Sequence, residues 1–291
     1  MDGILCIDKP AEITSFVCCA KARRILGEKK AGHAGTLDPM ATGVLPILIG
    51  KATRALDLIP THDKRYTATM QFGFESDTLD IWGNVRKTEK KPPVLSEIEA
   101  VLPRFRGDIL QVPPMTSALK KDGKRLYELA RQGIEVERQP RPITVYALEI
   151  LDYQPESGTL TFDCHCSKGT YIRSICDDIG RLLGCGAVMT ALRRTMAAGF
   201  SLSDCVTFEA LEAAAEKEPF ILPIEKVFST YPAVTVSAAQ AVRFRNGGAL
   251  AAERLHTKLP QVPVRVFAPD GVFLGLGQEK EQSLAVLKLF V

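Results

Sequence analysis

The stretch GHAGTLDPMATGVLPILIG, residues 32–50, constrains the fold more than any other part of the chain. Three of its glycines, at positions 32, 35 and 43, permit tight turns and the close approach of another molecule. The apolar run at residues 44–49 is typical of a buried strand. Because Pro39 biases the preceding residue toward an extended backbone, the carboxylate of Asp38 is held at one place in the loop. The sequence therefore predicts a fixed carboxylate on a bent loop that is anchored to a core.

The Asp-Pro pair also has a purely structural interpretation. An aspartate followed by proline starts many helices, as N-cap and first helical residue, and Gly43 would then end a single turn. His33 in the same loop favours a functional site, but the residues alone leave both interpretations open. A phosphate-binding P-loop is excluded, because the later glycines are wrongly spaced and neither Ser nor Thr follows Lys51.

Length and composition set broad limits. A chain of 291 residues is long enough for one large domain and one small domain. Its 46% hydrophobic and 24% charged residues are typical of a globular protein, and a formal net charge of +3 predicts only local basic clusters, mainly in residues 1–200. No apolar run reaches the ~20 residues of a membrane helix and no signal peptide is apparent, so we expect a cytoplasmic protein without membrane contact.

The eight cysteines follow neither a metal-site nor a disulfide spacing. No Cys-x-x-Cys occurs, and a strand over residues 164–166 would place two thiols on one face and His165 on the other. We therefore expect buried free thiols in a reducing compartment and no metal site.

Local patterns predict further elements. Strands are expected at residues 3–7, 63–73 and 159–166, the last two from alternating polar and apolar side chains. Thr14 or Ser15 caps a helix that ends at Gly27, and a second helix, over residues 52–59, carries Arg54. In residues 232–291, Ser237 and Gln240 form a capping box, and strands at 262–268, 272–277 and 284–290 predict a separate small β-barrel.

Three further features have open interpretations. Tyr66 is either a core residue or a site residue. Asp77 and Asp80 could flank a sugar in glycosidic chemistry, although turn formation is the commoner use of such aspartates. The segment 111–142, rich in Lys and Arg and with a short helix over 126–132, suits either a solvated surface or a nucleic-acid contact.

Arg173 is expected to pair with a carboxylate. It lies in the first turn of a helix that follows residues 167–170, away from the apolar stripe of that helix. A cation is slightly unfavourable there, because the helix dipole is positive at that end. The residues alone do not identify the carboxylate.

The stretch GHAGTLDPMATGVLPILIGKATR resembles the active-site motif of the TruB family of pseudouridine synthases, and CSKGTYIRSI and MTALRRTMAAGF resemble two further family motifs. The resemblance implies an α+β fold, with a pseudouridine-synthase-type mixed, largely antiparallel sheet flanked by helices in residues 1–231. It implies a small C-terminal PUA-like β-barrel domain in residues 232–291 and an RNA-clasping insertion at about 111–142. Glu12 stands where the family usually has glycine.

The resemblance also implies site residues. Asp38 matches the catalytic aspartate, Tyr66 an active-site tyrosine, and Arg173 the arginine that pairs with the aspartate. Arg193 and Arg194 are candidate contacts to the RNA backbone. The residues implied to bind the substrate are His33, Tyr171, Leu192, Lys9, Arg54, Asp80 and Lys120.

The implied activity is the isomerisation of uridine-55 in the T-arm of tRNA to pseudouridine, with an aspartate nucleophile acting on a flipped-out uridine. No cofactor, metal or protein partner is implied, and a monomer is expected. Two other classes remain. A non-catalytic tRNA-binding or folding protein on the same scaffold would tolerate a change of Asp38, whereas a nucleoside hydrolase-like glycosidase would need paired carboxylates and metal ligands that we do not find.

Overall fold

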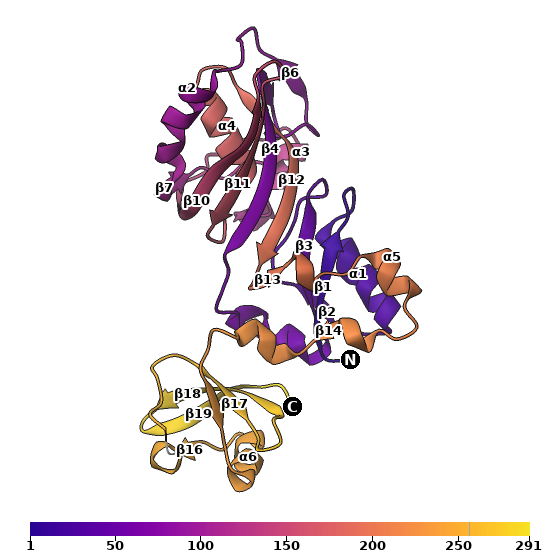
Figure 1. Cartoon of the computed structure of the whole chain (residues 1–291), viewed down its shortest axis with the longest axis vertical. Helices are drawn as coiled ribbons and strands as arrows, with labels where there is room; N and C mark the ends of the chain where they lie inside the picture. The colour runs from indigo at the N-terminus through magenta and orange to yellow at the C-terminus, as the bar shows by residue number, and fades with distance from the viewer. Residues whose placement is uncertain (256) are drawn as a thin grey trace.

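The computed structural model describes residues 1–255 and 257–291, which form two main sheets with helices packed against them and two small hairpins (Figure 1). The first sheet has ten strands and the second has five. Helices and strands are mixed along the chain rather than strictly alternating, so the predicted α+β class is confirmed.

The large sheet is mixed but mostly antiparallel, as predicted. Its only parallel pairing among the described strands joins β12 to β3, where Arg193 lies opposite Thr42. In order across the sheet the strands are β14 (Ile221–Leu222), β1 (Gly3–Lys9), β3 (Thr42–Ile49), β12 (Ala187–Ala197), β4 (Lys64–Phe72), β11 (Thr159–Cys166), β10 (Arg141–Gln154) and β7 (Gly107–Gln111), with β2 (Ala31–His33) beside β3 and β13 (Phe200–Ser201) beside β12.

Helices cover two parts of this sheet. Near the N-terminus, α1 (Ser15–Leu26) and α5 (Phe208–Ala213) pack against β1 and β3 around a cluster that includes Cys18 and Phe208. Farther along, α2 (Leu95–Val101) and α4 (Ile172–Leu182) pack on β4, β10 and β11 around Phe162. The α1 cap is as predicted: the Thr14 side chain accepts from the Val17 N–H, and Gly27 ends the helix in the left-handed conformation.

Short elements complete the first unit. Of residues 52–59, predicted helical, residues 52–58 belong to the 3₁₀ helix η1 (Gly50–Leu58), and Ile59 is extended. The hairpin of β5 (Phe74–Ser76) and β6 (Val85–Lys87) encloses the loop that carries Asp80. The other 3₁₀ helices are η2 (Leu102–Phe105), η3 (Leu202–Asp204), η4 (Glu218–Phe220), η5 (Ile224–Phe228) and η6 (Ala252–Arg254).

Between β7 and β10, the chain leaves the sheet. This insertion contains the small hairpin of β8 (Lys120–Lys121) and β9 (Lys124–Arg125), followed by α3 (Leu126–Arg131). Its cationic side chains at 120–125 are exposed, whereas Leu126 and Leu129 are buried. The insertion is therefore a short, charged appendage with a small apolar base.

The second sheet is a curled half-barrel rather than a closed barrel, since its first and last described strands do not pair. Helix α6 (Ala238–Arg245), capped by Ser237 as predicted, packs on this sheet. Phe228, Phe273 and Phe290 join the second sheet to the first. Its order is β15 (Ala233–Thr235), β17 (Val264–Phe267), β18 (Phe273–Lys280), β19 (Ser283–Leu289) and β16 (Leu250–Ala251).

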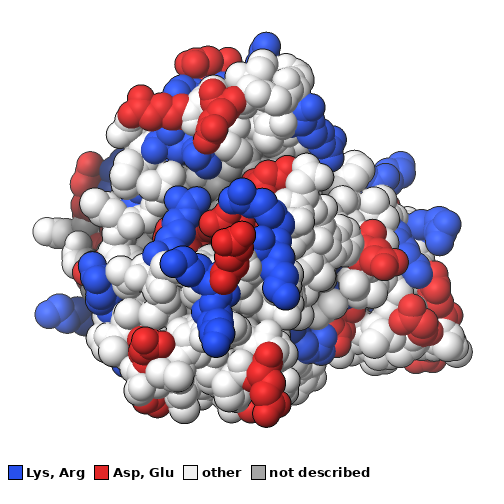
Figure 2. All heavy atoms as spheres, turned by 90° about the horizontal axis from the view of Figure 1, so that it is seen from above, with Lys and Arg blue, Asp and Glu red and all other residues white. Residues whose placement is uncertain are grey.

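Charges are distributed in local groups. Figure 2, viewed from the end that carries α2 and β6 in Figure 1, shows Lys and Arg side chains gathered around a small acidic group. Seven of the eight cysteines are buried and Cys205 is half-buried, and all are free thiols, as predicted. Among the described residues, no helix combines the length and apolar character needed to cross a membrane.

Candidate active site

The loop that carries Asp38 connects β2 to β3 and bends at residues 38–41. The Asp38 carbonyl accepts a hydrogen bond from the Ala41 N–H at 3.0 Å, which closes a turn and not a helix. The helix-capping interpretation of the Asp-Pro pair is therefore wrong. β3, which follows the turn, is buried from Gly43 onward, as the apolar run predicted.

The buried Lys9 side chain holds this turn through hydrogen bonds to its backbone. Its side chain is 0% exposed, and its ammonium donates to the carbonyls of Pro10 at 2.8 Å, Pro39 at 3.1 Å and Ala41 at 2.6 Å. Burial lowers the pKa of Lys9. Because all three donors of the ammonium are engaged by backbone oxygens, Lys9 fixes both ends of the Asp38 turn.

Arg194 and Ser15 hold the other side of the loop. Arg194, also 0% exposed, donates to the carbonyls of Gly35 and Thr36 at 3.1 Å each and to that of Val44 at 2.8 Å. The Ser15 hydroxyl accepts from the Leu37 N–H at 2.8 Å. Two buried cations and one hydroxyl thus bind the backbone on both sides of Asp38.

Arg173 faces Asp38 from the first turn of α4. Its Nη2 lies 3.0 Å from Asp38 Oδ2, and its Nη1 lies 3.5 Å from Asp80 Oδ2. Arg173 is 5% exposed, whereas the Asp38 side chain is 36% exposed. The carboxylate partner expected for Arg173 is therefore present, and Asp38 is the member of the pair that solvent can reach.

Asp80 contacts Arg173 and is held in place by its own loop. Its Oδ1 accepts from the Thr78 hydroxyl at 2.7 Å and from the Trp82 N–H at 3.0 Å. Asp77 points elsewhere and accepts from the backbone and side-chain amides of Asn84 at 2.9 and 2.8 Å. The two aspartates therefore do not form a pair of catalytic carboxylates.

A cleft of about 260 Å³ opens at the Asp38–Arg173 pair. Tyr66, Tyr171 and Leu192, which come from β4, the N-cap of α4 and β12, line it together with the pair. Burial raises the pKa of Tyr66 to about 12, so its hydroxyl keeps its proton at neutral pH. Five of the predicted site residues thus meet in one cleft.

His33, Arg54 and Lys120 do not line that cleft. His33 lines a neighbouring pocket of about 260 Å³ that shares Gly35 and Lys64 with the cleft. Burial and the nearby Arg194 cation lower the pKa of His33, which keeps its ring neutral at pH 7. Arg54 is exposed on η1, and Lys120 is exposed on the hairpin of the insertion.

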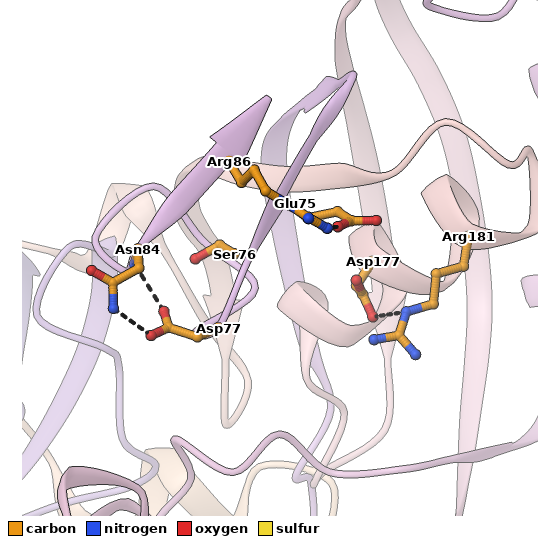
Figure 3. A pocket seen from close by; sticks show the side chains of 7 residues that line it. All are labelled: Glu75, Ser76, Asp77, Asn84, Arg86, Asp177 and Arg181. Carbon is orange, nitrogen blue, oxygen red and sulfur yellow. Dashed lines mark hydrogen bonds and ion pairs between the residues drawn. The ribbon is translucent and has the colours of Figure 1, made fainter. Parts of the chain in front are cut away.

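A larger pocket, of about 360 Å³, lies between the β5–β6 hairpin and α4 (Figure 3). Its charges already satisfy one another: Arg181 Nε lies 2.8 Å from Asp177 Oδ2, and Arg86 pairs with Glu75. It is more polar than the cleft, but it contains none of the residues that surround Asp38.

The cleft favours one kind of chemistry. An accessible carboxylate held by a buried guanidinium can attack, or stabilise, an electron-poor carbon. The neutral Tyr66 offers a ring face and a hydroxyl beside it. No group of three His, Cys, Asp or Glu side chains that could hold a metal ion occurs among the residues described.

Comparison with solved structures agrees with the fold. A crystal structure of a Cbf5–Nop10–Gar1 complex has a TM-score of 0.75 and 28% identity over 99% of this chain and 85% of that chain. An H/ACA RNP bound to a substrate RNA containing 2'-deoxyuridine has a TM-score of 0.74 and 25% identity, over 99% of this chain and 85% of that chain.

Three family models together span most of the sequence. Residues 23–172 match the TruB family pseudouridylate synthase N-terminal domain, residues 173–229 the tRNA pseudouridylate synthase B C-terminal domain, and residues 232–290 the pseudouridine synthase II TruB C-terminal region. Fold, site and these matches define a pseudouridine synthase, which is an isomerase.

Curated relatives identify the family. A tRNA pseudouridine synthase B of Clostridium kluyveri is 42% identical over all of this chain and all of that protein. One of Aromatoleum aromaticum is 44% identical over 96% of this chain and 89% of that protein. The chain belongs to the TruB family, as its motifs indicated.

The sequence did not identify the supports of the site. Arg194 was a candidate RNA contact, yet it is fully buried, and Arg193 instead lies 2.7 Å from Asp8. One signal was available: the strand period of two places Arg194 on the same face as the buried Leu192. Nothing local marks Thr116, which binds Arg173.

Proposed function

We propose that this protein converts uridine-55 in the T-arm of tRNA to pseudouridine, with Asp38 as the nucleophile. The observation that carries the proposal is the accessible Asp38 carboxylate held 3.0 Å from the buried Arg173 guanidinium, at the mouth of a cleft. The names of the curated relatives support tRNA as the substrate. The long match around Asp38 supports position 55.

The reaction is an isomerisation. The bond between N1 of uracil and C1′ of ribose breaks, the uracil ring turns, and its C5 joins C1′. C5 then loses its proton, and N1, which carries no proton in uridine, gains one, so atoms and charge balance without a cofactor. Asp38 provides the nucleophilic carboxylate during the stage in which the uracil ring is detached from the ribose.

The surroundings of Asp38 suit that role. Arg173 pairs with the Asp38 carboxylate at 3.0 Å and sets its orientation. Tyr66, Tyr171 and Leu192, which line the cleft, offer ring faces and apolar surface to a uracil ring that has left its stack. Flipping a base costs a few kcal/mol, a cost that such contacts offset.

Contacts farther from the cleft would bind the rest of the RNA. The buried His33 Nδ1 has no hydrogen-bond partner in the described structure, which supports a substrate contact in its pocket. Arg54 and Lys120, both exposed, suit phosphate contacts. Lys9 and Asp80 have their charged groups engaged by protein atoms, so we assign them a supporting role.

The domain assignment follows the same logic. We assign residues 1–231 to catalysis, with the insertion at 111–142 clasping the T-arm, and residues 232–291 to a PUA-like RNA-binding domain. In the insertion, Arg125 and Arg131 lie 5.9 and 5.5 Å from the ring centroid of Tyr127, an arrangement that suits RNA binding. The working unit is a monomer.

The proposal is tested with an unmodified tRNA transcript. We expect the wild-type protein to form pseudouridine at position 55, and Asp38→Asn to bind the transcript with unchanged affinity but form none. Asp57→Asn, which changes an exposed carboxylate on η1, is the matched control and should retain full activity. A second transcript with cytidine at position 55 tests the position.

Either of two results would overturn the assignment. Pseudouridine formation by Asp38→Asn at the wild-type rate would remove Asp38 from the chemistry, and a non-catalytic RNA-binding role would then fit any retained binding. Equal pseudouridine formation in the cytidine-55 transcript would show that another uridine is the substrate.

A further inference from the structure

The beginning of the insertion is docked along the first turn of α4. The Gln111 side chain donates to the Tyr171 carbonyl at 3.0 Å and accepts from the Tyr171 N–H at 2.8 Å. The Ser174 hydroxyl donates to the Val112 carbonyl at 3.3 Å. Gln111 is 3% exposed, so this contact lies inside the protein. The helix end that carries Arg173 is thus bound to the first residues of the insertion.

Thr116 makes the closest contact in this region. Arg173 Nη1 donates to the Thr116 hydroxyl at 2.6 Å, and Nη2 donates to the Thr116 carbonyl at 3.2 Å. The same two nitrogens face Asp80 and Asp38. The Thr78 carbonyl also accepts from Nη1, at 3.1 Å, so Thr116 helps to fix the orientation of the guanidinium together with these groups. Because Arg173 is 5% exposed, water cannot readily replace a missing acceptor.

The residues after Thr116 connect it to the exposed part of the insertion. The Ser117 carbonyl accepts from the Tyr127 N–H at 3.0 Å, and the Leu119 carbonyl accepts from the Leu126 N–H at 2.8 Å. These bonds attach the start of α3 to residues 117–119. The exposed cations at 120–125 lie between the two attached segments. The part of the insertion with the most exposed charge is therefore linked through four residues to the arginine.

We propose that Thr116 is a positioning residue: it orients Arg173 toward Asp38 and transmits the placement of the insertion on RNA to that ion pair. This inference rests on the proposed function, because it assumes that the insertion contacts tRNA. Thr116 acts through Arg173, because both its hydroxyl and its carbonyl accept hydrogen bonds from that guanidinium. Docking of the insertion on the T-arm and orientation of the Arg173 guanidinium toward Asp38 are then one event.

The test compares Thr116→Val with Thr116→Ser in single-turnover reactions on the tRNA transcript. Valine keeps the shape of threonine and removes the hydroxyl, whereas serine keeps the hydroxyl. We expect a tenfold to hundredfold slower step in Thr116→Val, about the effect of one hydrogen bond to a charged group, with the Kd for tRNA changed less than about twofold. Thr116→Ser should restore the rate to within about threefold of wild type.

A double-mutant cycle separates positioning from direct substrate contact. If Thr116 acts through Arg173, adding Thr116→Val to Arg173→Lys should cause no further loss of rate. If it contacts the substrate itself, the two losses should multiply, which would overturn the proposal. A Thr116→Val rate equal to wild type, or a weaker Kd with an unchanged rate, would also overturn it. Should Thr116→Val not fold, Thr116→Ala is compared with Thr116→Ser in the same way.

This outcome is distinguishable from failure of the proposed function. The proposed function predicts that the Asp38→Asn variant forms no pseudouridine. If Asp38→Asn is inactive and Thr116→Val is fully active, the enzyme assignment stands and only the role of Thr116 is refuted. If Asp38→Asn is active, the proposed function and the proposed role of Thr116 are both refuted.

Discussion

The two sides of the cleft are held in different ways. Lys9 and Arg194, both 0% exposed, bind the backbone around Asp38 from within the protein. Arg173 is also buried, but two of its hydrogen-bond acceptors belong to Thr116, at the start of an insertion whose continuation is exposed at 120–125. The carboxylate thus has a fixed place set by the core, while its guanidinium partner depends on a segment at the surface.

The difference has an energetic basis. A buried cation with several carbonyl acceptors is costly to disturb, because each lost bond leaves a desolvated polar group. The backbone of the Asp38 loop is therefore costly to displace. A peripheral segment with few buried apolar side chains opens at lower free energy, which makes it the place where binding can influence the site. The comparison yields four predictions.

Arg173→Lys should have the largest effect, since lysine cannot face Asp38 and Asp80 and bind Thr116 in one plane. We expect the single-turnover rate to fall by about 100-fold or more. Arg181→Lys, on the same helix but 71% exposed, should leave the rate unchanged. A wild-type rate in Arg173→Lys would mean that charge alone suffices on this side of the cleft.

Arg194→Met tests the core side. Removal of the guanidinium leaves the carbonyls of Gly35, Thr36 and Val44 without their donor, and we expect the free energy of unfolding to fall by about 2–4 kcal/mol. Arg193→Met, at the adjacent and partly exposed position, should cost less than about 1 kcal/mol. Denaturant titration measures the free energy of unfolding of both variants. Equal losses in the two variants would contradict the expected difference between the buried and the partly exposed arginine.

Tyr66→Phe tests burial at the wall of the cleft. Its pKa rises from 10 to about 12, so the folded protein keeps a proton that the unfolded chain loses above pH 10. The free energy of unfolding should therefore fall between pH 10 and 12, and below pH 10 Tyr66 should have no pH-dependent effect. Tyr66→Phe should remove about 2 kcal/mol of this alkaline loss. Parallel wild-type and mutant curves would show that Tyr66 ionises normally.

Glu12→Gly should have the smallest effect, and it should stabilise the protein. Glu12 has φ of 70°, a left-handed conformation that glycine adopts more easily, and its N–H donates to the Pro39 carbonyl at 2.8 Å. We expect thermal unfolding to show a gain of about 1 kcal/mol. Glu12→Ala should give no gain, and a gain in both variants would assign the effect to the lost carboxylate.

Much of the fold follows from local patterns. The strand over 159–166, the Thr14 and Ser237 caps and the strand after Gly43 all appear as the residues predict. These features depend on neighbours within a few residues, so the sequence records them directly. The small C-terminal barrel was also predicted, but its curled half-barrel form depends on pairing between distant segments, which local patterns do not record.

The sequence by itself predicted a buried strand after Gly43 and a carboxylate partner for Arg173, and it left open whether Asp38 caps a helix or lies on a bent loop. Only the tertiary structure decided that Asp38 and Arg173 meet at 3.0 Å, that Lys9 and Arg194 are structural cations, and that Thr116 binds the guanidinium. The physical reason is that an ion pair or a buried hydrogen bond depends on how strands and helices far apart in the chain pack together. No spacing along the chain encodes that packing.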